Sequence, residues 1–402
     1  MMGNSDRRLL IAMLVAIVAG GCAGFFWGAA MQSVAWIGQL FLTALKMMIV
    51  PLVVASIITG VAGLGDVRKL GRMGLLSVGY YACTTLIAVA IGLLMANLWQ
   101  PGVGVDLASA AAVPSPKAGD VGMADLILSL VHPNIVAAAA QMKLLPLILF
   151  CILLAAALTT IGDKGAVVIA FFDGLNDAMM RLVGWLMLFA PIGVFALIAA
   201  KLGAAGGGDA FVAQLAALAR YALAVISGLL THAALLSLLL LLLARRSVLG
   251  YLKNLGTALM TAFSTASSSA TLPLTMEGVQ AAGVSERARR FVLPLGATVN
   301  MDGTALYEAV AVLFIAQAYG IELGLGQQML VLVTATMAAI GAAGIPEAGL
   351  VTMVMVLNAV GLPLDGIGLI LAIDWFLDRC RTTINVFGDS VGAAIVGRWT
   401  GG

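Results

Sequence analysis

Five ionisable side chains fall within sixteen positions of a strongly apolar part of the chain. They lie in the segment DWFLDRCRTTINVFGD at 374–389 and are Asp374, Asp378, Arg379, Arg381 and Asp389. Polar residues of this segment recur every three or four positions and would share one face of a helix: Asp374, Asp378, Arg381 or Thr382, Asn385 and Asp389. At ~1.5 Å per residue that face is roughly 22 Å long.

A charged side chain at the middle of a bilayer costs about 2.5–3.5 kcal/mol. Several charges on one helical face therefore predict a polar path inside a membrane protein. The alternative is a set of structural ion pairs that neutralise one another. The uncharged Thr382 and Asn385 continue the same face and favour the polar path.

A second polar cluster lies in the segment GATVNMDGTALYEAV, which begins at Gly296. Asn300, Asp302 and Thr304 stand at every second position and so cannot share a helical face. Gly296 and Gly303 permit local unwinding, which would turn side chains and freed carbonyls toward one small volume. Oxygen ligands of these kinds suit a hard cation. The alternative is that Asn300 and Asp302 only tie helices together.

Glu308 follows in the same segment and is expected to be buried. Burial favours the neutral form of a carboxylic acid. We therefore consider Glu308 a candidate for carrying a proton.

The composition places these clusters in a membrane protein. Of 402 residues, 62% are hydrophobic and 10% charged, with a mean hydropathy of +1.09. Soluble domains carry roughly 25% charged residues. The long apolar runs predict helical spans rather than barrel strands. The net charge of +2 gives no indication of nucleic-acid binding. His132 and His232 stand alone, and the four cysteines lie in apolar runs, so we expect neither a histidine metal site nor a bound cofactor.

Basic residues predict the topology, because they favour the cytoplasmic side. They gather in alternate segments: Arg7, Arg8; Arg68, Lys69, Arg72; Lys164; Arg245, Arg246, Lys253; Arg287, Arg289, Arg290; Arg398. The connections between these segments hold only Lys117, Lys143 and Lys201. Both termini are therefore expected in the cytoplasm.

Two segments are expected to enter the membrane and return. The stretch at 255–285 lies between two basic clusters, so it must leave and re-enter the same side, with its tip at SSSATLP. The stretch at 327–360 contains glycines and Pro346 at its centre, between connections poor in basic residues. With helices at 291–318 and 366–397, this arrangement predicts an inverted repeat, which is typical of transporters.

The polar segments together resemble one family. SSSATLPLT, NMDGTALYEA, GAAGIPEAGLVTM and DWFLDRCRTTINVFGDS are similar to the four signature segments of the glutamate transporter family. LKMMIVPLVVASIITGV resembles its second helix. This family contains dicarboxylate/amino acid:cation symporters, including excitatory amino acid transporters. The resemblance covers nearly the whole chain.

The resemblance implies an all-α polytopic fold with eight transmembrane helices and two re-entrant hairpins. It implies a homotrimer in the plasma membrane (a bacterial inner membrane), in contact with lipid, that works as an elevator and performs no catalysis. Scaffold helices 1 and 2 would lie in 1–70, and an external loop with scaffold helices 4 and 5 in 99–205. The transport domain would comprise helix 3 at 71–98 and the region 206–402.

The resemblance also implies a substrate, L-glutamate or L-aspartate. Arg381 would bind the side-chain carboxylate and Asp378 the α-amino group. Further contacts would come from hydroxyls and amides on the helices and from the hairpin tips: Thr304, Thr382 and Asn385, then Ser267, Ser268, Ser269, Ile345 and Gly349.

The implied cations are sodium, with Glu308 matching the proton-carrying position of vertebrate-type members. One sodium position corresponds to Gly296, Asn300, Asn385 and Asp389, and a second to Tyr81, Thr84, Thr85, Asn300 and Asp302. A third relies on main-chain oxygens near Thr298, Ala339, Ile340 and Ala342. Ala339 departs from the serine often found at its position.

Archaeal members carry an arginine where this chain has Ala266, and the charge stands instead at Arg379, which we expect to partner the acidic cluster. Within the family, the alternatives are a proton-driven C4-dicarboxylate carrier and a neutral amino acid carrier. More distant alternatives are a channel and an intramembrane aspartyl protease, whose GxGD signature is incomplete in VFGD.

Overall fold

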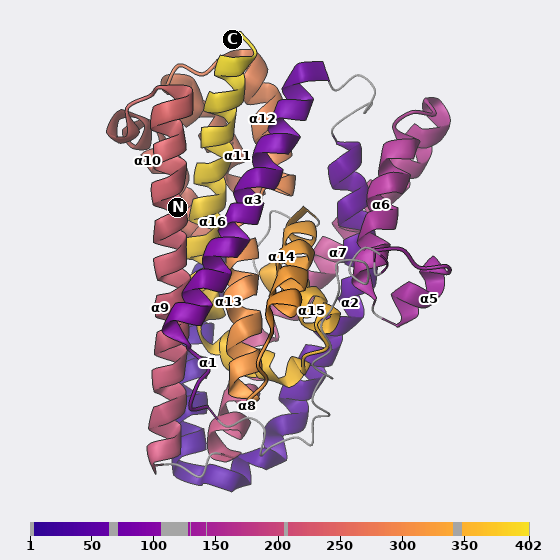
Figure 1. Cartoon of the computed structure of the whole chain (residues 1–402). Coiled ribbons are helices and arrows are strands. Elements are labelled where there is room, and N and C mark those ends of the chain that lie inside the picture. Colours follow the sequence, from indigo (N-terminus) through magenta and orange to yellow (C-terminus); the bar gives the residue numbers. More distant parts are fainter. Residues whose placement is uncertain are drawn as a thin grey trace.

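The computed structural model describes residues 4–63, 71–105, 128, 130–141, 143–204, 208–340 and 348–401, and every regular element in these ranges is a helix (Figure 1). The helices before residue 205 are α1 (Asn4–Trp27), α2 (Ala35–Ala62), α3 (Gly71–Trp99), α5 (Ile135–Ala140), α6 (Leu144–Leu158), α7 (Asp163–Met187) and α8 (Ala190–Ala204). The later helices are α9 (Gly208–Leu239), α10 (Val248–Thr265), α11 (Ser268–Ala281), α12 (Glu286–Val299), α13 (Asp302–Ala318), α14 (Leu325–Ile340), α15 (Ala348–Ala359) and α16 (Ile367–Trp399).

The described helices confirm an all-helical fold with long apolar segments. Three of them are long and apolar enough to cross a membrane: Gly71–Trp99, Leu215–Ala244 and Glu286–Ala318. A fourth forms if α7 and α8 are taken together across a 56° bend. The expected number of eight spans stays a prediction.

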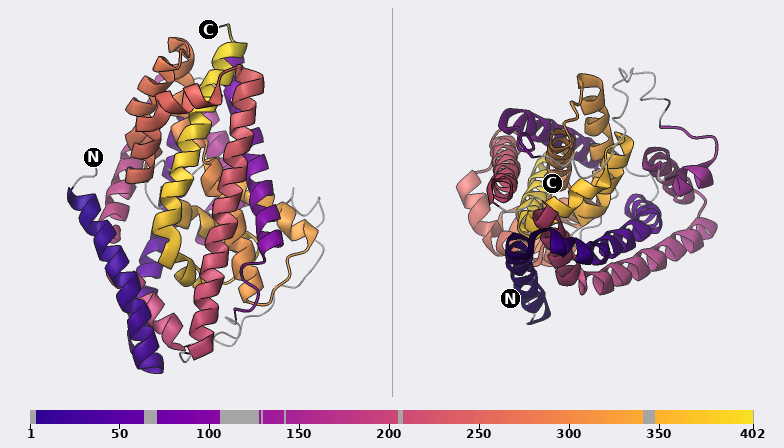
Figure 2. Two further views of the ribbon diagram at one scale, coloured as in Figure 1. Left: turned by 90° about the vertical axis from the view of Figure 1, so that its left-hand side faces the viewer. Right: turned by 90° about the horizontal axis from the view of Figure 1, so that it is seen from below.

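The contacts divide the helices into two groups. In the first helix group, α2 packs on α6, α7 and α8, and α1 packs on α8. In the second helix group, α3 packs on α9 and α13, and α16 packs on α9, α10, α12 and α13. Figures 1 and 2 show α2, α6 and α7 to one side of α3, α13 and α16. The groups meet where α8 contacts α16 and where α14 and α15 contact α6.

Two antiparallel helix pairs lie in the regions expected to form hairpins. Helices α10 and α11 pack against each other, as do α14 and α15. The turn of the first pair is at Ala266 and Ser267, at the first residue of the expected tip: Ala266 adopts a left-handed conformation, and the Ser267 side chain accepts a hydrogen bond from the Ala270 amide. This serine cap starts α11 at Ser268, so most of SSSATLP is helical, including Pro273.

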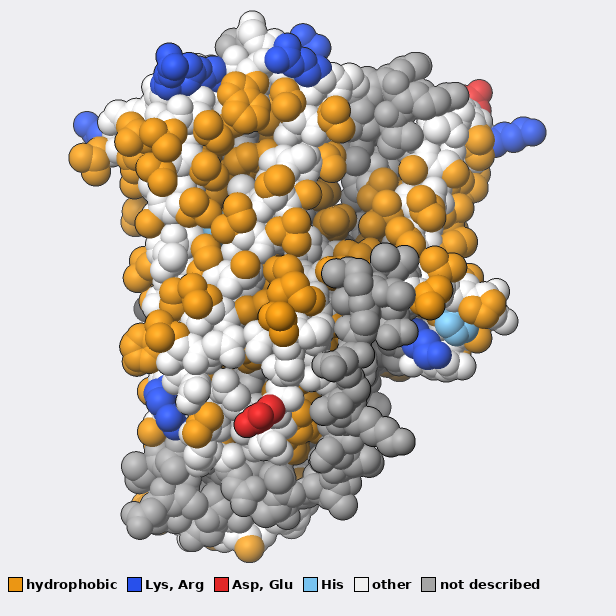
Figure 3. Space-filling model, viewed as in Figure 1, with side chains coloured by type: hydrophobic (Ala, Val, Ile, Leu, Met, Phe, Trp, Pro, Cys, Tyr) orange, Lys and Arg blue, Asp and Glu red, His pale blue; other side chains and the backbone are white. Residues whose placement is uncertain are grey.

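The basic segments meet at one end of the molecule. In Figure 1, the starts of α3, α10 and α12 lie at the same end as the final turns of α9 and α16. Lys and Arg side chains gather at this end in the space-filling view, above a broad surface of hydrophobic side chains (Figure 3). The α10–α11 pair thus leaves and returns to the end that carries Arg246 and Arg289.

Gly92 sets the close contact of α3 with α13. A Cβ atom at this position would lie 2.5 Å from the Leu306 carbonyl oxygen, which is backbone and cannot move aside. Gly79 lies on the same helix, and a Cβ atom there would meet nothing within 4 Å.

Replacing these two glycines should have opposite effects. We expect Gly92→Ala to destabilise the fold by about 2 kcal/mol through overpacking. Gly79→Ala should leave stability unchanged or raise it, because alanine is the better helix former. Thermal unfolding of the detergent-solubilised variants measures both effects. Equal unfolding midpoints would contradict the assigned role of Gly92.

Candidate functional site

Arg381 lies at the centre of the polar face of α16 and is fully buried. Its Nη2 atom donates a 2.7 Å hydrogen bond to Asp378 Oδ1. Its Nη1 atom forms an ion pair at 3.0 Å with Asp374 Oδ1, although without the alignment of a hydrogen bond. The predicted helix thus brings two carboxylates to one guanidinium. Asp374, which was predicted to lie on this face but without a specific role, is a direct partner of Arg381.

Two neighbouring elements enclose this guanidinium. The Tyr307 ring of α13 stacks on it, with 3.8 Å between the Arg381 Cζ atom and the ring centroid, which is a close cation–π contact. Gly349, in the first turn of α15, lies on it so closely that a Cβ atom there would be 2.9 Å from Arg381 Nη1. A side chain at this position would require the Arg381 guanidinium to shift.

The other polar residues of this face meet the start of α13. Asn385 Oδ1 accepts a 2.7 Å hydrogen bond from the Gly303 amide, and Asn385 Nδ2 lies 3.4 Å from Thr304 Oγ1. Thr382 is buried on the same face. The structure therefore brings Thr304, Thr382 and Asn385 together with Arg381, as the sequence predicted.

The tip of the α10–α11 pair is close to this face as well. Arg379 donates hydrogen bonds to the carbonyl oxygens of Phe263 at 3.1 Å and Ser264 at 2.5 Å, in the last turn of α10. Ser267 and Ser268 are buried, whereas Ser269 is exposed. Of the second tip, Ile345 lies outside the described residues.

The helix containing NMDG breaks where the polar residues are closest together. Helix α12 ends at Val299, α13 begins at Asp302, and Asn300 and Met301 have non-helical backbone angles. The glycines expected to unwind the chain are themselves helical. Gly296 instead admits the Asp389 carboxylate, because a Cβ atom there would lie 2.5 Å from Asp389 Oδ1.

Two buried carboxylates face this break. Asn300 Nδ2 donates a 2.9 Å hydrogen bond to Asp389 Oδ1. Asp302 Oδ1 accepts a hydrogen bond from Thr85 Oγ1 at 2.7 Å and a weaker one from Thr84 at 3.4 Å. Among the described residues, neither aspartate forms an ion pair with Lys or Arg. Two buried carboxylates without such a partner favour a bound cation.

Tyr81 lies beside the same break. Its hydroxyl donates a 2.8 Å hydrogen bond to the Val292 carbonyl oxygen, and a Cβ atom on Gly296 would lie 2.5 Å from the Tyr81 oxygen. The Asn300 side-chain oxygen is buried and accepts no hydrogen bond from the described residues. An amide oxygen of this kind is suited to a hard cation.

The residues predicted for the third sodium position are only partly described. The Thr298 hydroxyl donates to Leu295 O within its own helix, at 3.0 Å. Ala339 is buried and Ile340 half-buried at the end of α14. Ala342 lies outside the described residues, so this set stays a prediction.

Glu308 is fully buried on α13. It interacts with Thr352 of α15, yet neither carboxyl oxygen has a well-aligned hydrogen bond from a described residue. An ionised carboxylate is costly in such a place.

His232 is a site residue that the sequence did not indicate. It is fully buried on α9, and its Nε2 atom lies 2.9 Å from Asp302 Oδ2. This contact leaves Asp302 held on both oxygens. A histidine inside an apolar span is itself a signal of function, but its partner cannot be read from the sequence.

Comparison with known proteins gives consistent matches along the chain. Residues 9–399 match the model of the sodium:dicarboxylate symporter family. Human excitatory amino acid transporter 3 is 38% identical over 412 residues, which cover 89% of this chain and 78% of the relative. The putative sodium-dependent excitatory amino acid transporter glt-4 of Caenorhabditis elegans is 39% identical, over 90% of this chain and 82% of the relative.

Asp374 should stabilise the fold through Arg381. Replacing it by asparagine leaves a buried guanidinium with one carboxylate fewer, and breaking a buried pair costs about 3 kcal/mol. We therefore expect Asp374→Asn to lower the thermal unfolding midpoint clearly. Glu286→Gln is the control, because it breaks the exposed Glu286–Arg290 pair and should change the midpoint little. Equal midpoints for both variants would show that the Asp374 pair contributes nothing.

Proposed function

Because the chain belongs to the sodium:dicarboxylate symporter family, we propose that it carries acidic amino acids, L-glutamate and L-aspartate, together with sodium. The observation that carries this proposal is the buried pair of Arg381 and Asp378 beside two further buried carboxylates, Asp302 and Asp389. The pair offers one cationic and one anionic group to a zwitterionic ligand with an acidic side chain. The two carboxylates offer the negative charge that co-transported cations require.

Substrate binding would separate the Arg381–Asp378 pair and give each residue a partner on the substrate. A side-chain carboxylate of the amino acid replaces Asp378 on the Arg381 guanidinium, for which a planar fork of N–H donors is well suited. Asp378 is then available to accept the α-ammonium group. Hydroxyl and amide groups of Thr304, Thr382 and Asn385 would complete the contacts. Main-chain amides at the hairpin tips would bind the carboxylates: Ser267, Ser268, Ser269, Ile345 and Gly349.

Sodium would occupy the volume around the break between α12 and α13. One ion would be held by Gly296, Asn300, Asn385 and Asp389, and another by Tyr81, Thr84, Thr85, Asn300 and Asp302. The main chain near Thr298, Ala339, Ile340 and Ala342 would hold a third. His232 would position Asp302, because its hydrogen bond to Oδ2 fixes how Oδ1 is presented.

The boundary between the two helix groups supports an elevator mechanism. Side-chain hydrogen bonds between the described helices stay within one group, as from Ser56 to Asn176 and from Thr85 to Asp302. The connection after α3 is joined to the second group, since Gln317 accepts from the Gly102 amide and Arg220 donates to the Val103 carbonyl oxygen. The contacts across the boundary are apolar, as where Gly368 of α16 approaches Leu197 of α8. Such a boundary resists sliding less than one joined by polar contacts.

We accordingly propose that the second helix group moves as a transport domain, comprising 71–98 and 206–402. The regions 1–70 and 99–205 would form the scaffold of a homotrimer. We place the protein in a plasma membrane with eight spans and two re-entrant hairpins. Both termini would be cytoplasmic, and the C-terminus lies at the end where the arginines gather (Figure 1).

Uptake into proteoliposomes tests the proposed function. An inward sodium gradient should drive saturable uptake of radiolabelled aspartate and glutamate, and unlabelled succinate should compete poorly because it has no ammonium group for Asp378. Asp389→Asn should reduce sodium-driven uptake at least tenfold, because removing one buried charge of a cation site costs about 1.4 kcal/mol or more.

Three outcomes would contradict parts of this proposal. Equal uptake without sodium would overturn the cation assignment. Succinate competing better than both amino acids would overturn the role of Asp378. A continuous current that does not depend on substrate would indicate a channel rather than a carrier.

Glu308 is proposed to carry a proton with each transport cycle. Glu308→Gln keeps the shape of the side chain but cannot bind or release a proton. We expect its sodium-driven uptake to lose the dependence on an imposed pH gradient that the wild-type protein shows. Proteoliposomes with the two gradients varied separately measure this, and unchanged proton dependence in the variant would exclude Glu308 as the carrier.

A further inference from the structure

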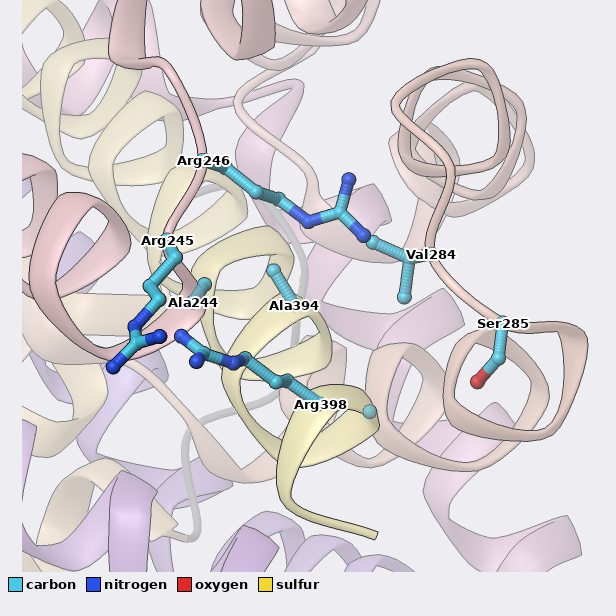
Figure 4. A pocket seen from close by; sticks show the side chains of 8 residues that line it. Ala244, Arg245, Arg246, Val284, Ser285, Ala394 and Arg398 are labelled. Atoms are coloured by element: carbon cyan, nitrogen blue, oxygen red, sulfur yellow. The ribbon is translucent and has the colours of Figure 1, made fainter. Parts of the chain in front are cut away.

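A cavity rich in arginine lies at the end of the molecule opposite the α13–α14 turn. It has a volume of about 370 Å³ and is formed where the final turns of α9 and α16 meet the turn between α11 and α12 (Figure 4). Arg245, Arg246, Arg398 and Ser285 line it, and we call it the arginine pocket. Its lining among the described residues includes no Asp or Glu.

Two of these arginines are fixed by main-chain oxygens. Arg246 donates to the carbonyl oxygens of Ala282 and Gly283 at the end of α11. Arg398 Nη1 donates a 2.8 Å hydrogen bond to the Leu243 carbonyl oxygen, close to the end of α9. These bonds hold each guanidinium at the wall of the pocket. Each guanidinium has five N–H donors, so others remain for a ligand.

Arg245 ends the helical turn that follows α9, and its backbone N–H caps that turn by donating to the Leu240 carbonyl oxygen. Its side chain forms no hydrogen bond or ion pair with another described residue, and in Figure 4 its guanidinium points toward that of Arg398. Its backbone is left-handed, with φ at 53°, a conformation that glycine adopts without strain. The backbone therefore does not require an arginine here. A basic residue suits the cytoplasmic side, and the pocket beside it gives the charge a second use in binding a ligand.

Three guanidinium groups around one cavity repel one another unless an anion lies between them. Guanidinium groups match phosphate particularly well, because their planar N–H donors bind two phosphate oxygens at once. A phosphate group therefore has the charge and the hydrogen-bonding geometry that this cavity accepts.

The surroundings of the pocket indicate where the phosphate comes from. Leu241 and Leu242, in the helical turn before Arg245, are 51% and 59% exposed, and Leu249 just after it is 82% exposed. Trp399 is exposed beside Arg398. Figure 3 shows that the basic side chains at this end lie directly above a hydrophobic surface. Basic side chains above a hydrophobic surface suit the level at which the headgroups of a bilayer meet its acyl chains.

We propose that the arginine pocket binds the phosphate of an anionic membrane lipid, whose acyl chains lie along the exposed Leu241, Leu242 and Leu249. The bound lipid links α9, α16 and the α11–α12 turn, which are three separate parts of the second helix group. It would therefore stabilise the arrangement of the helices that carry His232, Arg381 and Asp389. The proposal requires that this end lies at a membrane surface, but not that any particular substrate is carried.

Thermal unfolding of the full-length protein in a neutral detergent tests this site directly. The probes are dioctanoyl phosphatidylglycerol, dioctanoyl phosphatidylcholine and inorganic phosphate, each titrated at constant ionic strength. We expect phosphatidylglycerol to raise the unfolding midpoint saturably, and the other two to have little effect. The Arg245→Gln/Arg398→Gln double variant should need at least about tenfold more phosphatidylglycerol for half the effect.

The matched control is Arg287→Gln/Arg290→Gln. It removes the same charge from exposed positions at the same end but outside the pocket, and it should shift the titration by no more than about twofold. Arg246 is kept in all variants because it caps α11. Arg245→Gly, which suits the left-handed backbone, is the second variant if the double variant unfolds early, and it too should weaken the lipid effect.

Three results would overturn the proposal. The first is an equal response to phosphatidylglycerol and phosphatidylcholine. The second is an equal loss in the pocket variant and the control, which would indicate diffuse surface charge. The third is a saturable effect of inorganic phosphate as strong as that of the lipid, which would indicate a site for a free anion.

Discussion

The whole polar interior is organised around one buried charge, the Arg381 guanidinium. An arginine cannot release its proton inside a protein, so its burial must be compensated where it stands. The compensation comes from three helices: Asp374 and Asp378 on α16, the Tyr307 ring on α13, and the bare backbone of Gly349 on α15. A ligand that displaces one of these groups from Arg381 must therefore supply negative charge to the guanidinium in its place.

The second constraint is the interrupted main chain between α12 and α13. A break of this kind is tolerated inside a membrane protein only where other groups satisfy the freed peptide units. Here the Gly303 amide donates a hydrogen bond to Asn385, and the Asn300 side chain donates one to Asp389. Side chains of α16 therefore supply hydrogen-bond partners to groups at the break. The proposed cation site and the broken helix therefore share the same residues, and both depend on the polar residues of α16.

Much of this could be predicted from the sequence, because polar residues in apolar surroundings are conspicuous. The polar face of α16, the break after Val299 and both helix pairs were indicated by residue type and spacing. A local cap narrows the predicted tip: the side chain of Ser267, the first residue of SSSATLP, starts α11, so the rest of that segment is helical. The roles of Gly296 and Gly303 were misjudged, because these glycines admit Asp389 and Arg381 rather than loosen the backbone.

The contacts that could not be predicted join residues far apart in the chain. His232 and Asp302 are separated by 70 positions, and nothing in the run around His232 points to its partner. Tyr307 reads as an ordinary apolar residue of a buried helix until the packing of α13 against α16 is known. The contact of Asp374 with Arg381, in contrast, could have been predicted from their spacing, since seven residues make about two helical turns.

The apolar boundary between the two helix groups has a consequence for motion. Hydrophobic contact is non-directional, so one position of the groups along such a boundary is nearly as favourable as the next. In the proposed elevator motion, the boundary would guide the displacement but would not define where it stops. Its end points would then be set by contacts away from the boundary, at the helix ends and at the turns of the two helix pairs.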